Sequence, residues 1–495
     1  MEIIVNDVYY IKRGGFVKQL TRINKSNRPV KILQFGEGNF LRAFVDNFFQ
    51  VLNEKELFNG SICVVQPLSF GRVKDLEQQG GLYTLYLEGI NKGKVVKEHQ
   101  IIDVLTDFIN PYEQLDKYLE YARSKDLEYI ISNTTEAGIV YEEELISKTK
   151  TPNSFPAKLL LFLHERFNHF NGSKEVGLEI IPCELIDDNG TKLLEILVKL
   201  AKFNKLSDDF IKWLKEDNYY FNTLVDRIVP GYPRDEIDEI TKELGYIDHS
   251  IVKGEIFHLW VLDNNQGYRS KLEQPFKKSG LEVFFVDSIK PYKERKVKIL
   301  NGTHTAMVPV SYLIGHEAVK ESIEDPIILE FVKSLVYEEI IPTIELPFDD
   351  MDKFAKSVFE RYLNPFVHHL LMSISLNSVS KYKSRILPTV LGQEKLGHFP
   401  KHALFSLAAL IRFYKGVDEK GTKINLSDDK EFLALFKKLW ETNDLDLIVS
   451  KFLSLDFWET TYLQKPEVIK FVTKYLKVMN DEGMLVALKQ LLGEK

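Results

Sequence analysis

The chain contains 495 residues, of which 44% are hydrophobic and 28% charged, and it carries a formal net charge of −7 at pH 7. This length predicts two domains, and the acidic balance argues against nucleic-acid binding, which a basic domain or stripe would indicate. Two cysteines, a start without signal-peptide layout and no apolar run near the roughly 20 residues that cross a bilayer favour a soluble cytoplasmic protein without a membrane partner.

Residues 1–28 are polar and mixed in pattern, and we expect them to form an N-terminal extension. From residue 31 onwards, short apolar runs alternate with helix-length stretches. Near-continuous apolar strands separated in this way are typical of a parallel sheet covered on both faces. Residues 29–286 are therefore predicted to form a doubly wound α/β domain. The expected strands are KILQF (31–35), SICVV (61–65), EYIIS (128–132), LEIIPC (178–183), FHLWVL (257–262) and LEVFFV (281–286).

The first strand runs into a glycine turn that opens a helical pattern. Gly36 permits a tight turn, and Gly38 lets the backbone approach a pyrophosphate at a helix N-terminus without a Cβ in the way. Leu41 stands where a G-x-G-x-x-G motif has its third glycine, so a purely steric role for the two glycines is the alternative. The residues expected to contact a dinucleotide are Phe35, Gly36, Glu37, Gly38, Asn39, Phe40 and Arg42.

The second strand lacks the acidic residue that usually binds the ribose 2′-hydroxyl of NAD. Gln66 and Pro67 follow SICVV, and no carboxylate occurs before Asp75. Arg72 and Lys74 suggest either a place for a 2′-phosphate or two solvated loop charges, and the second interpretation is favoured. The motifs alone therefore do not separate NAD from NADP.

After residue 286 the pattern changes to long amphipathic segments at helical spacing, so residues 287–495 are predicted to form a mostly α-helical domain. The segment KPYKERKVKILNGTH (290–304) is the most informative. At roughly 100° per residue, Lys293, Asn301 and His304 fall about 60°, 140° and 80° from Lys296, so all four share one helix face.

This shared face has two interpretations. As a catalytic face, Lys296 exchanges a proton, Asn301 donates to a carbonyl oxygen that gains negative charge, and His304 holds a hydroxyl or orients the lysine. As a structural face, it is a basic surface in contact with water. Spacing alone leaves both open.

Six stretches together form a specific pattern over roughly residues 30–490. They are FGEGNFLRA (35–43), SNTTEAG (132–138), CELIDDNG (183–190), TLVDRIVPG (223–231), KERKVKILNGTHTA (293–306) and NSVSKYKSRILP (377–388). In this order the chain resembles the mannitol dehydrogenase family of polyol-specific long-chain dehydrogenases. The resemblance implies a Rossmann-like NAD-binding domain followed by a helical domain. It also implies reversible hydride transfer between NAD(H) and a ketose or its acid, without a metal.

The resemblance also implies roles for individual residues. Lys296 of the K-x-x-x-x-N-x-x-H pattern matches the family's general acid/base, and Asn301 and His304 complete the motif. The second asparagine that polarises the carbonyl most plausibly matches Asn189, although this chain has Cys183-Glu184-Leu185 where the polyol enzymes have C-D-N. A further family lysine matches Lys381. Residues that border the nicotinamide are expected at Thr134, Thr135 and Glu136.

Within the family, the likeness is closest to the branch that acts on keto-sugar acids, so we expect a small sugar-acid substrate. Its carboxylate needs a basic partner, for which Lys381, Lys383, Arg385 and Arg361 are candidates; the last three are equally well explained as surface charges. The alternatives are a reductase for an epimeric keto acid, a polyol dehydrogenase and, in another class, a non-catalytic nucleotide-sensing protein. His368, His369, His398 and His402 lack an accompanying carboxylate or cysteine cluster, so no metal site is expected.

Overall fold

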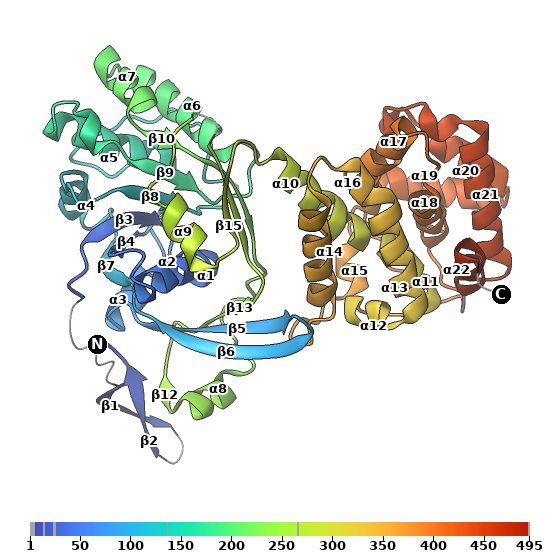
Figure 1. Ribbon diagram of the computed structural model, residues 1–495, viewed down its shortest axis with the longest axis horizontal. Helices are drawn as coiled ribbons and strands as arrows, with labels where there is room; N and C mark the ends of the chain where they lie inside the picture. The colour runs from blue at the N-terminus through green and yellow to red at the C-terminus, as the bar shows by residue number, and fades with distance from the viewer. Residues whose placement is uncertain (1–4, 13–14, 23–25, 136, 265–266, 494–495) are drawn as a thin grey trace. The chain divides into compact units, whose positions relative to one another are not determined.

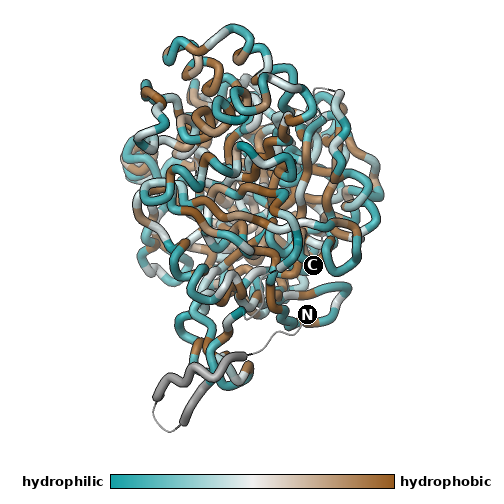
Figure 2. The backbone as a smooth tube through the Cα atoms, turned by 90° about the vertical axis from the view of Figure 1, so that its left-hand side faces the viewer, coloured by the Kyte–Doolittle hydropathy of each residue, from teal (hydrophilic) through white to brown (hydrophobic). Residues whose placement is uncertain are grey.

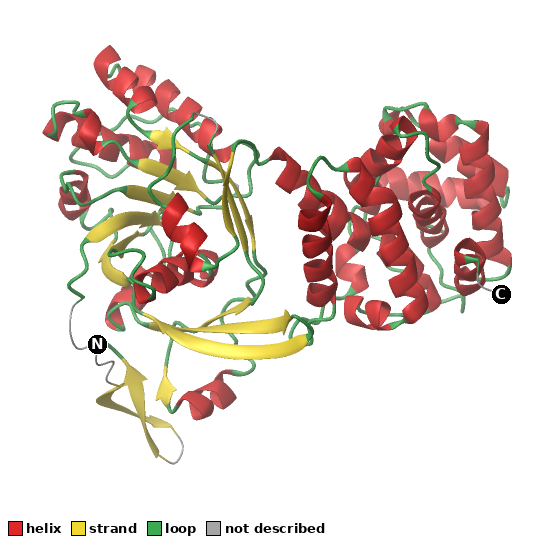
Figure 3. Cartoon of the chain, in the orientation of Figure 1, coloured by secondary structure: helices red, strands yellow, loops and turns green. Residues whose placement is uncertain are grey.

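The computed structural model of the chain describes residues 5–12, 15–22, 26–135, 137–264 and 267–493. The chain divides into two compact units, the first formed by residues 1–88 and 96–289 and the second by residues 89–95 and 290–495. The sequence placed the change of domain at residues 286–287. Figure 3 shows the difference in texture, since strands mix with helices in the first unit and helices dominate the second.

A six-stranded parallel sheet lies at the centre of the first unit (Figure 1), in the order β10-β9-β8-β3-β4-β7. The chain proceeds outward from β3 in one direction through β4 and β7, then returns to continue through β8, β9 and β10. This reversal is the doubly wound arrangement, so the predicted fold class is confirmed. The strands are β3 (Val30–Phe35), β4 (Ser61–Val65), β7 (Leu105–Ile109), β8 (Tyr129–Ser132), β9 (Glu179–Pro182) and β10 (Tyr219–Tyr220).

The sheet is buried on both faces because neighbouring residues of a strand point to opposite sides. Ile32 of β3 joins one core cluster, and its neighbour Leu33 joins the other. In Figure 2 the hydrophobic stretches of the tube run mainly through the interior. The helices of this unit are α1 (Asn39–Ala43), α2 (Val45–Glu54), α3 (Val73–Gln78), α4 (Leu115–Ala122), α5 (Phe155–His169), α6 (Asn189–Phe203), α7 (Asp208–Glu216), α8 (Ile237–Leu244) and α9 (Glu273–Ser279).

Two of the six expected strands form but do not join the central sheet. The runs at 257–262 and 281–286 become β14 (Leu259–Asp263) and β15 (Val283–Val286), which make a separate sheet with β11 (Asn222–Asp226). The expectation of one parallel sheet was wrong here, because an apolar run indicates burial without specifying a partner strand, and β11 pairs with β14 antiparallel. A third sheet contains β5 (Tyr83–Asn91), β6 (Lys94–Ile102) and β13 (Val252–Glu255).

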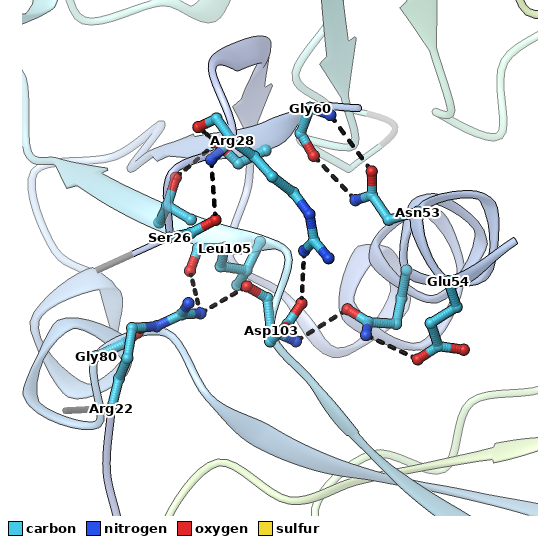
Figure 4. A network of polar contacts seen from close by, with 12 residues as sticks. Arg22, Ser26, Arg28, Asn53, Glu54, Gly60, Gly80, Asp103 and Leu105 are labelled. Carbon is cyan, nitrogen blue, oxygen red and sulfur yellow. Dashed lines mark hydrogen bonds and ion pairs between the residues drawn. The ribbon is translucent and has the colours of Figure 1, made fainter. Parts of the chain in front are cut away.

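The N-terminal segment forms a hairpin of β1 (Val5–Lys12) and β2 (Gly15–Leu20), and β2 pairs with β12 (Tyr246–Ile247). Arginines then attach the chain to the first unit (Figure 4). Arg22 donates to the carbonyl of Gly80 at 2.7 Å, and Arg28 pairs with Asp103 at 2.9 Å. The segment expected as an extension is therefore held to the first unit by strand pairing and by buried polar contacts.

The second unit is a packed set of helices. The apolar segment LFSLAALI lies in the almost fully buried α18 (Lys401–Phe413), which packs against α11 (Thr303–Ile314) and α21 (Pro466–Asp481). No helix in the described ranges is long and apolar enough to cross a membrane. The other helices are α10 (Lys290–Arg295), α12 (Val319–Glu324), α13 (Pro326–Ser334), α14 (Phe348–Tyr362), α15 (Leu371–Ile374), α16 (Ser378–Arg385), α17 (Leu387–Lys395), α19 (Lys430–Glu441), α20 (Leu445–Leu453) and α22 (Met484–Leu492).

Candidate active site

The glycine turn after β3 is shaped for a ligand that approaches its backbone. Gly36 has φ +121°, and a Cβ there would lie 2.9 Å from the carbonyl oxygen of Asn133, so only glycine fits between the ends of β3 and β8. Gly38 precedes α1 and is exposed, with nothing within 4 Å of the position its Cβ would take. Among the residues that the structure describes, no side chain caps α1, so its first N–H groups are available to an anion. The turn therefore fits the pyrophosphate of a dinucleotide.

The side chains of the turn support it from inside. Arg42 is 4% exposed, and its guanidinium donates to the carbonyls of Glu37 and Ser250 and to Oδ1 of Asn39. Phe35 is buried in the core, and Phe40 stacks on Phe44 with 4.9 Å between ring centroids. Among the residues expected to contact the cofactor, Phe35, Phe40 and Arg42 thus hold the turn in place.

A buried carboxyl group lies directly behind the turn. The Tyr83 hydroxyl lies 2.7 Å from the carbonyl oxygen of Arg42 and 3.0 Å from Oδ2 of Asp46. The hydroxyl has one proton, and the carbonyl can only accept, so both contacts are satisfied when Asp46 carries a proton of its own. Burial raises the pKa of Asp46 to about 7, which agrees with that arrangement.

The ends of β8 and β9 lie beside the glycine turn. Glu184 is 2% exposed and accepts hydrogen bonds from Ser132 Oγ and from both the N–H and the hydroxyl of Thr134 at 2.9–3.0 Å. Burial raises the pKa of Glu184. The carboxylate thus fixes the loop that carries Thr134 and Thr135 beside Asn133 and the glycine turn, a role that no sequence motif indicated. Glu136, also expected at the cofactor, lies outside the described residues.

Asn189 lies at the start of α6 in the first unit and is fully buried. Its Nδ2 is 3.1 Å from the carbonyls of Pro182 and Glu184 and from the Thr223 hydroxyl, and its Oδ1 accepts from two backbone N–H groups. Both amide hydrogens therefore have acceptors within the fold. Asn189 therefore has no N–H left to donate to a substrate oxygen, the contact that was expected of it. Its hydrogen bonds instead position the turn after β9.

The segment with Lys296 departs from the expected continuous α-helix. After α10, residues 296–302 form a π-helical turn, and α11 begins at Thr303. Hydrogen bonds from i to i+5 widen this turn, and such turns occur often at functional sites. Asn301 follows Lys296 by five residues and therefore lies about one π-helical turn further along. The widened turn brings the two residues closer to the same side of the helix than α-helical spacing predicted.

Distant side chains stabilise this widened turn. Tyr362 at the end of α14 donates its hydroxyl hydrogen to the carbonyl of Leu300 at 2.8 Å, and the Thr303 hydroxyl lies 2.5 Å from Tyr362 Oη. Thr303 also contacts the carbonyl of Ile299. These hydroxyl groups satisfy carbonyls near the point where the helical hydrogen-bond pattern changes, so the turn depends on a residue about 60 positions away in the chain.

His304 lies in a cationic environment and is neutral. Its ring is 4.4 Å from the Tyr362 ring and 5.1 Å from the His369 ring, measured between centroids. Burial lowers the pKa of His304 well below its usual range, and the nearby His369, Arg361, Arg385 and Lys381 lower it further. Nε2 of His304 is buried without a hydrogen-bond partner among the described residues, so it can bind a hydroxyl.

The four candidate carboxylate partners separate into two groups. Arg361, Lys381 and Arg385 are close enough to His304 to shift its pKa. Lys383 instead pairs with Glu459 at 2.9 Å, 4.7 Å above the ring centroid of Phe457. We call His304, Arg361, Lys381 and Arg385 the cationic cluster; it lies entirely within the second unit.

Other chemistry is not indicated by the described part of the chain. No group of three or more histidine, cysteine or acidic residues within it could hold a metal ion. Cys63 and Cys183 are both buried and free. The cationic cluster, the π-helical turn and the glycine turn are therefore the candidate functional features of the described residues.

Comparisons with known proteins agree with this geometry. A family model described as the mannitol dehydrogenase Rossmann domain matches residues 30–274, and one described as the mannitol dehydrogenase C-terminal domain matches residues 288–479. The chain is 41% identical to an altronate oxidoreductase of Bacillus subtilis (strain 168) over 466 residues, which covers 93% of this chain and 95% of the relative. It is 42% identical to an altronate oxidoreductase of Yersinia pestis over 469 residues, covering 93% and 96%.

Solved structures share the fold. A D-sorbitol dehydrogenase in substrate-free form matches with a TM-score of 0.78 at 22% identity, covering 93% of this chain and 95% of that one. Mannitol 2-dehydrogenase of Pseudomonas fluorescens, in a ternary complex with NAD and D-mannitol, matches with a TM-score of 0.64 at 22% identity, covering 96% and 97%.

Proposed function

The chain belongs to the mannitol dehydrogenase family, and on this basis we propose that it interconverts D-tagaturonate and D-altronate with NAD(H) as a step of uronate catabolism. Relatives named altronate oxidoreductase match it over 93% of its length at 41–42% identity. As a CH–OH oxidoreductase with two buried free cysteines, the enzyme suits a reducing compartment, and we place it in the cytoplasm.

The cationic cluster is the main observation that supports a sugar acid as the substrate. Three cations surround a neutral histidine whose Nε2 has no partner among the described residues. Burial lowers the pKa of Lys381 and of Arg385, so these cations are partly removed from water. A substrate carboxylate would add charge-assisted hydrogen bonds to these cations, which a neutral polyol cannot form.

The proton-transfer step rests on the widened turn. Lys296 gives a proton to the substrate carbonyl oxygen during reduction and takes it back during oxidation. Asn301, one π-turn further along, donates to that oxygen as negative charge develops. Neutral His304 binds a substrate hydroxyl next to the reacting carbon. The intact set of Lys296, Asn301 and His304 argues against the non-catalytic nucleotide-sensing alternative.

The first unit holds the dinucleotide. Backbone N–H groups from Gly38 onwards bind the pyrophosphate, because nothing fills the space beside Gly38 and no side chain caps α1. Thr134, whose N–H and hydroxyl donate to Glu184, and the next residue Thr135 would border the nicotinamide. When bound, the nicotinamide supplies the hydride to the substrate carbon or accepts it from there.

The test is the loss of NADH absorbance with tagaturonate, fructuronate and fructose in parallel. We expect kcat/KM for tagaturonate to exceed that for fructuronate at least tenfold, and that for fructose by more. Faster turnover of fructuronate or fructose would favour a fructuronate reductase or a polyol dehydrogenase, respectively. No turnover of any of the three would overturn the enzyme proposal.

A further inference from the structure

The glycine turn contributes a carboxylate to the end of the second strand. Oε1 of Glu37 accepts a hydrogen bond from the backbone N–H of Arg72 at 3.1 Å. A Cβ on Gly71 would lie 2.3 Å from Oε1 of Glu37 and 2.6 Å from Oε1 of Gln66. The Glu37 carboxylate is therefore beside the loop that follows β4, although it comes from the turn that follows β3.

This position has a known chemical use in doubly wound folds. The residue that ends the second strand is usually acidic, and its carboxylate binds the ribose 2′-hydroxyl of NAD. In this chain β4 ends at Val65, and Gln66 and Pro67 follow it. Glu37 therefore brings a carboxylate to the loop after the second strand, in which the sequence has none before Asp75.

Arg72 and Lys74, the cations near this loop, form ion pairs with other carboxylates. Arg72 offers Glu37 its backbone N–H, while its guanidinium pairs with Asp75 at 2.9 Å and lines a cavity of about 690 Å³ that Glu37 does not line. Lys74 pairs with Glu113 at 2.9 Å. Each cation thus has a carboxylate partner in its own surroundings, and both pairs are exposed to solvent.

We propose that Glu37 selects NAD(H) over NADP(H): its carboxylate accepts a hydrogen bond from the adenosine ribose 2′-hydroxyl and repels a 2′-phosphate. This inference rests on the proposed function only in requiring that the first unit bind a nicotinamide dinucleotide. The hydroxyl would supply a further donor to a carboxylate whose pKa is raised by burial, because the backbone N–H groups of Arg72 and Glu37 and the charges of Arg42 and Arg72 offset that burial only in part.

The experiment measures the dissociation constants of NADH and NADPH, by nicotinamide fluorescence and without substrate, for wild type and Glu37→Gln. The amide keeps an acceptor for the Arg72 N–H but loses the charge. We expect wild type to bind NADH at least 100-fold more tightly than NADPH. In Glu37→Gln, NADPH should bind at least tenfold more tightly than it does to wild type. Glu77→Gln, which removes the same charge from an exposed position of α3, should keep the wild-type ratio within threefold.

A second measurement needs no variant. Adenosine 5′-monophosphate should displace NADH from wild type, whereas adenosine 2′,5′-bisphosphate at the same concentration should not. Equal binding of the two dinucleotides, or a Glu37→Gln ratio within threefold of wild type, would overturn the role of Glu37 while leaving the proposed reaction intact. Failure to bind either dinucleotide would overturn both, and tagaturonate would then not be reduced.

Discussion

In the first unit the groups available to a pyrophosphate are backbone N–H groups at the glycine turn, whereas in the second unit the groups available to the substrate are side chains on and around a widened helical turn. The glycine turn needs an empty position beside Gly38 and a positive φ at Gly36. The second unit instead gathers Arg361, Lys381 and Arg385 about the neutral ring of His304.

This difference shows how each unit manages buried charge. Near the glycine turn the ionisable side chains face inward and hold the backbone, as Arg42 and Asp46 do. In the second unit, basic side chains lie near a histidine whose pKa is lowered by burial and by their charges. A substitution in the first unit should therefore act through conformation and dinucleotide affinity, and one in the second unit through substrate affinity or proton transfer.

The largest effect is expected from Lys296→Ala. Loss of a general acid/base costs roughly 10²- to 10⁴-fold in rate, so kcat for tagaturonate reduction should fall by about that factor. The dissociation constant for NADH should stay within about twofold of wild type, because the dinucleotide turn belongs to the first unit. Stopped-flow absorbance and fluorescence titration measure the two quantities. A variant that keeps more than a tenth of wild-type kcat would remove Lys296 from the mechanism.

The next largest effect is expected on the pH dependence of stability, because a buried proton on Asp46 lies behind the glycine turn. The pKa of Asp46 is raised from 3.8 to about 7, so the folded state holds a proton that the unfolded chain releases. Stability from this group is complete below about pH 4 and is lost as the pH rises to about 7, a change on the order of 4 kcal/mol at 1.36 kcal/mol per pKa unit. Asp46→Asn cannot titrate, so its melting temperature relative to wild type should rise across that range. A difference that does not vary with pH would show that Asp46 is ionised in the fold.

The cationic cluster can be tested against a matched cation outside it. Arg361→Gln and Arg385→Gln should each raise KM for tagaturonate about 10- to 100-fold, since a hydrogen bond to a charged group contributes about 1.5–3 kcal/mol. Lys383→Gln, whose lysine pairs with Glu459, should leave KM within about twofold. Equal effects at all three positions would indicate a general electrostatic contribution to substrate binding.

The sequence predicted those parts of the two candidate sites that depend on residues close together in the chain. Apolar runs predicted β3, β4, β8 and β9, and the G-x-G spacing identified the turn. The π-helical turn could not be predicted, because Tyr362 and Thr303 stabilise it across about 60 residues of chain. Asn189 was expected at the substrate from its place in a motif, but its amide is fully engaged by groups up to 34 residues away.

The surroundings of each charged side chain could not be predicted from the sequence, for the same physical reason. The resemblance singled out Lys381 in NSVSKYKSRILP, but nothing in that stretch distinguishes Arg385 from Lys383, because the distinction comes from Glu459, which pairs with Lys383 from 76 residues further along the chain. The carboxylate of Glu37 likewise contacts a backbone N–H 35 residues away. A local pattern can predict which elements form, whereas the neighbour of a charged side chain is determined by tertiary packing.

The smallest effect, and the most direct test of the backbone site, comes from Gly38→Ala. The position lies outside the left-handed region, with φ −67°, and has no atom within 4 Å of the added Cβ. Stability should therefore stay within about 0.5 kcal/mol of wild type. NADH should bind about tenfold more weakly, a loss of about 1.4 kcal/mol, because the methyl group occupies the space that a pyrophosphate needs.

Gly36→Ala provides the contrast. Its φ of +121° and the 2.9 Å approach to Asn133 should cost about 1–3 kcal/mol of stability, measured by thermal or urea unfolding. If Gly38→Ala also lost stability, or bound NADH as wild type does, the two glycines would share a steric role. The first unit would then have to bind the pyrophosphate through side chains, as the second unit is proposed to bind its substrate, and the contrast between the two units would fail.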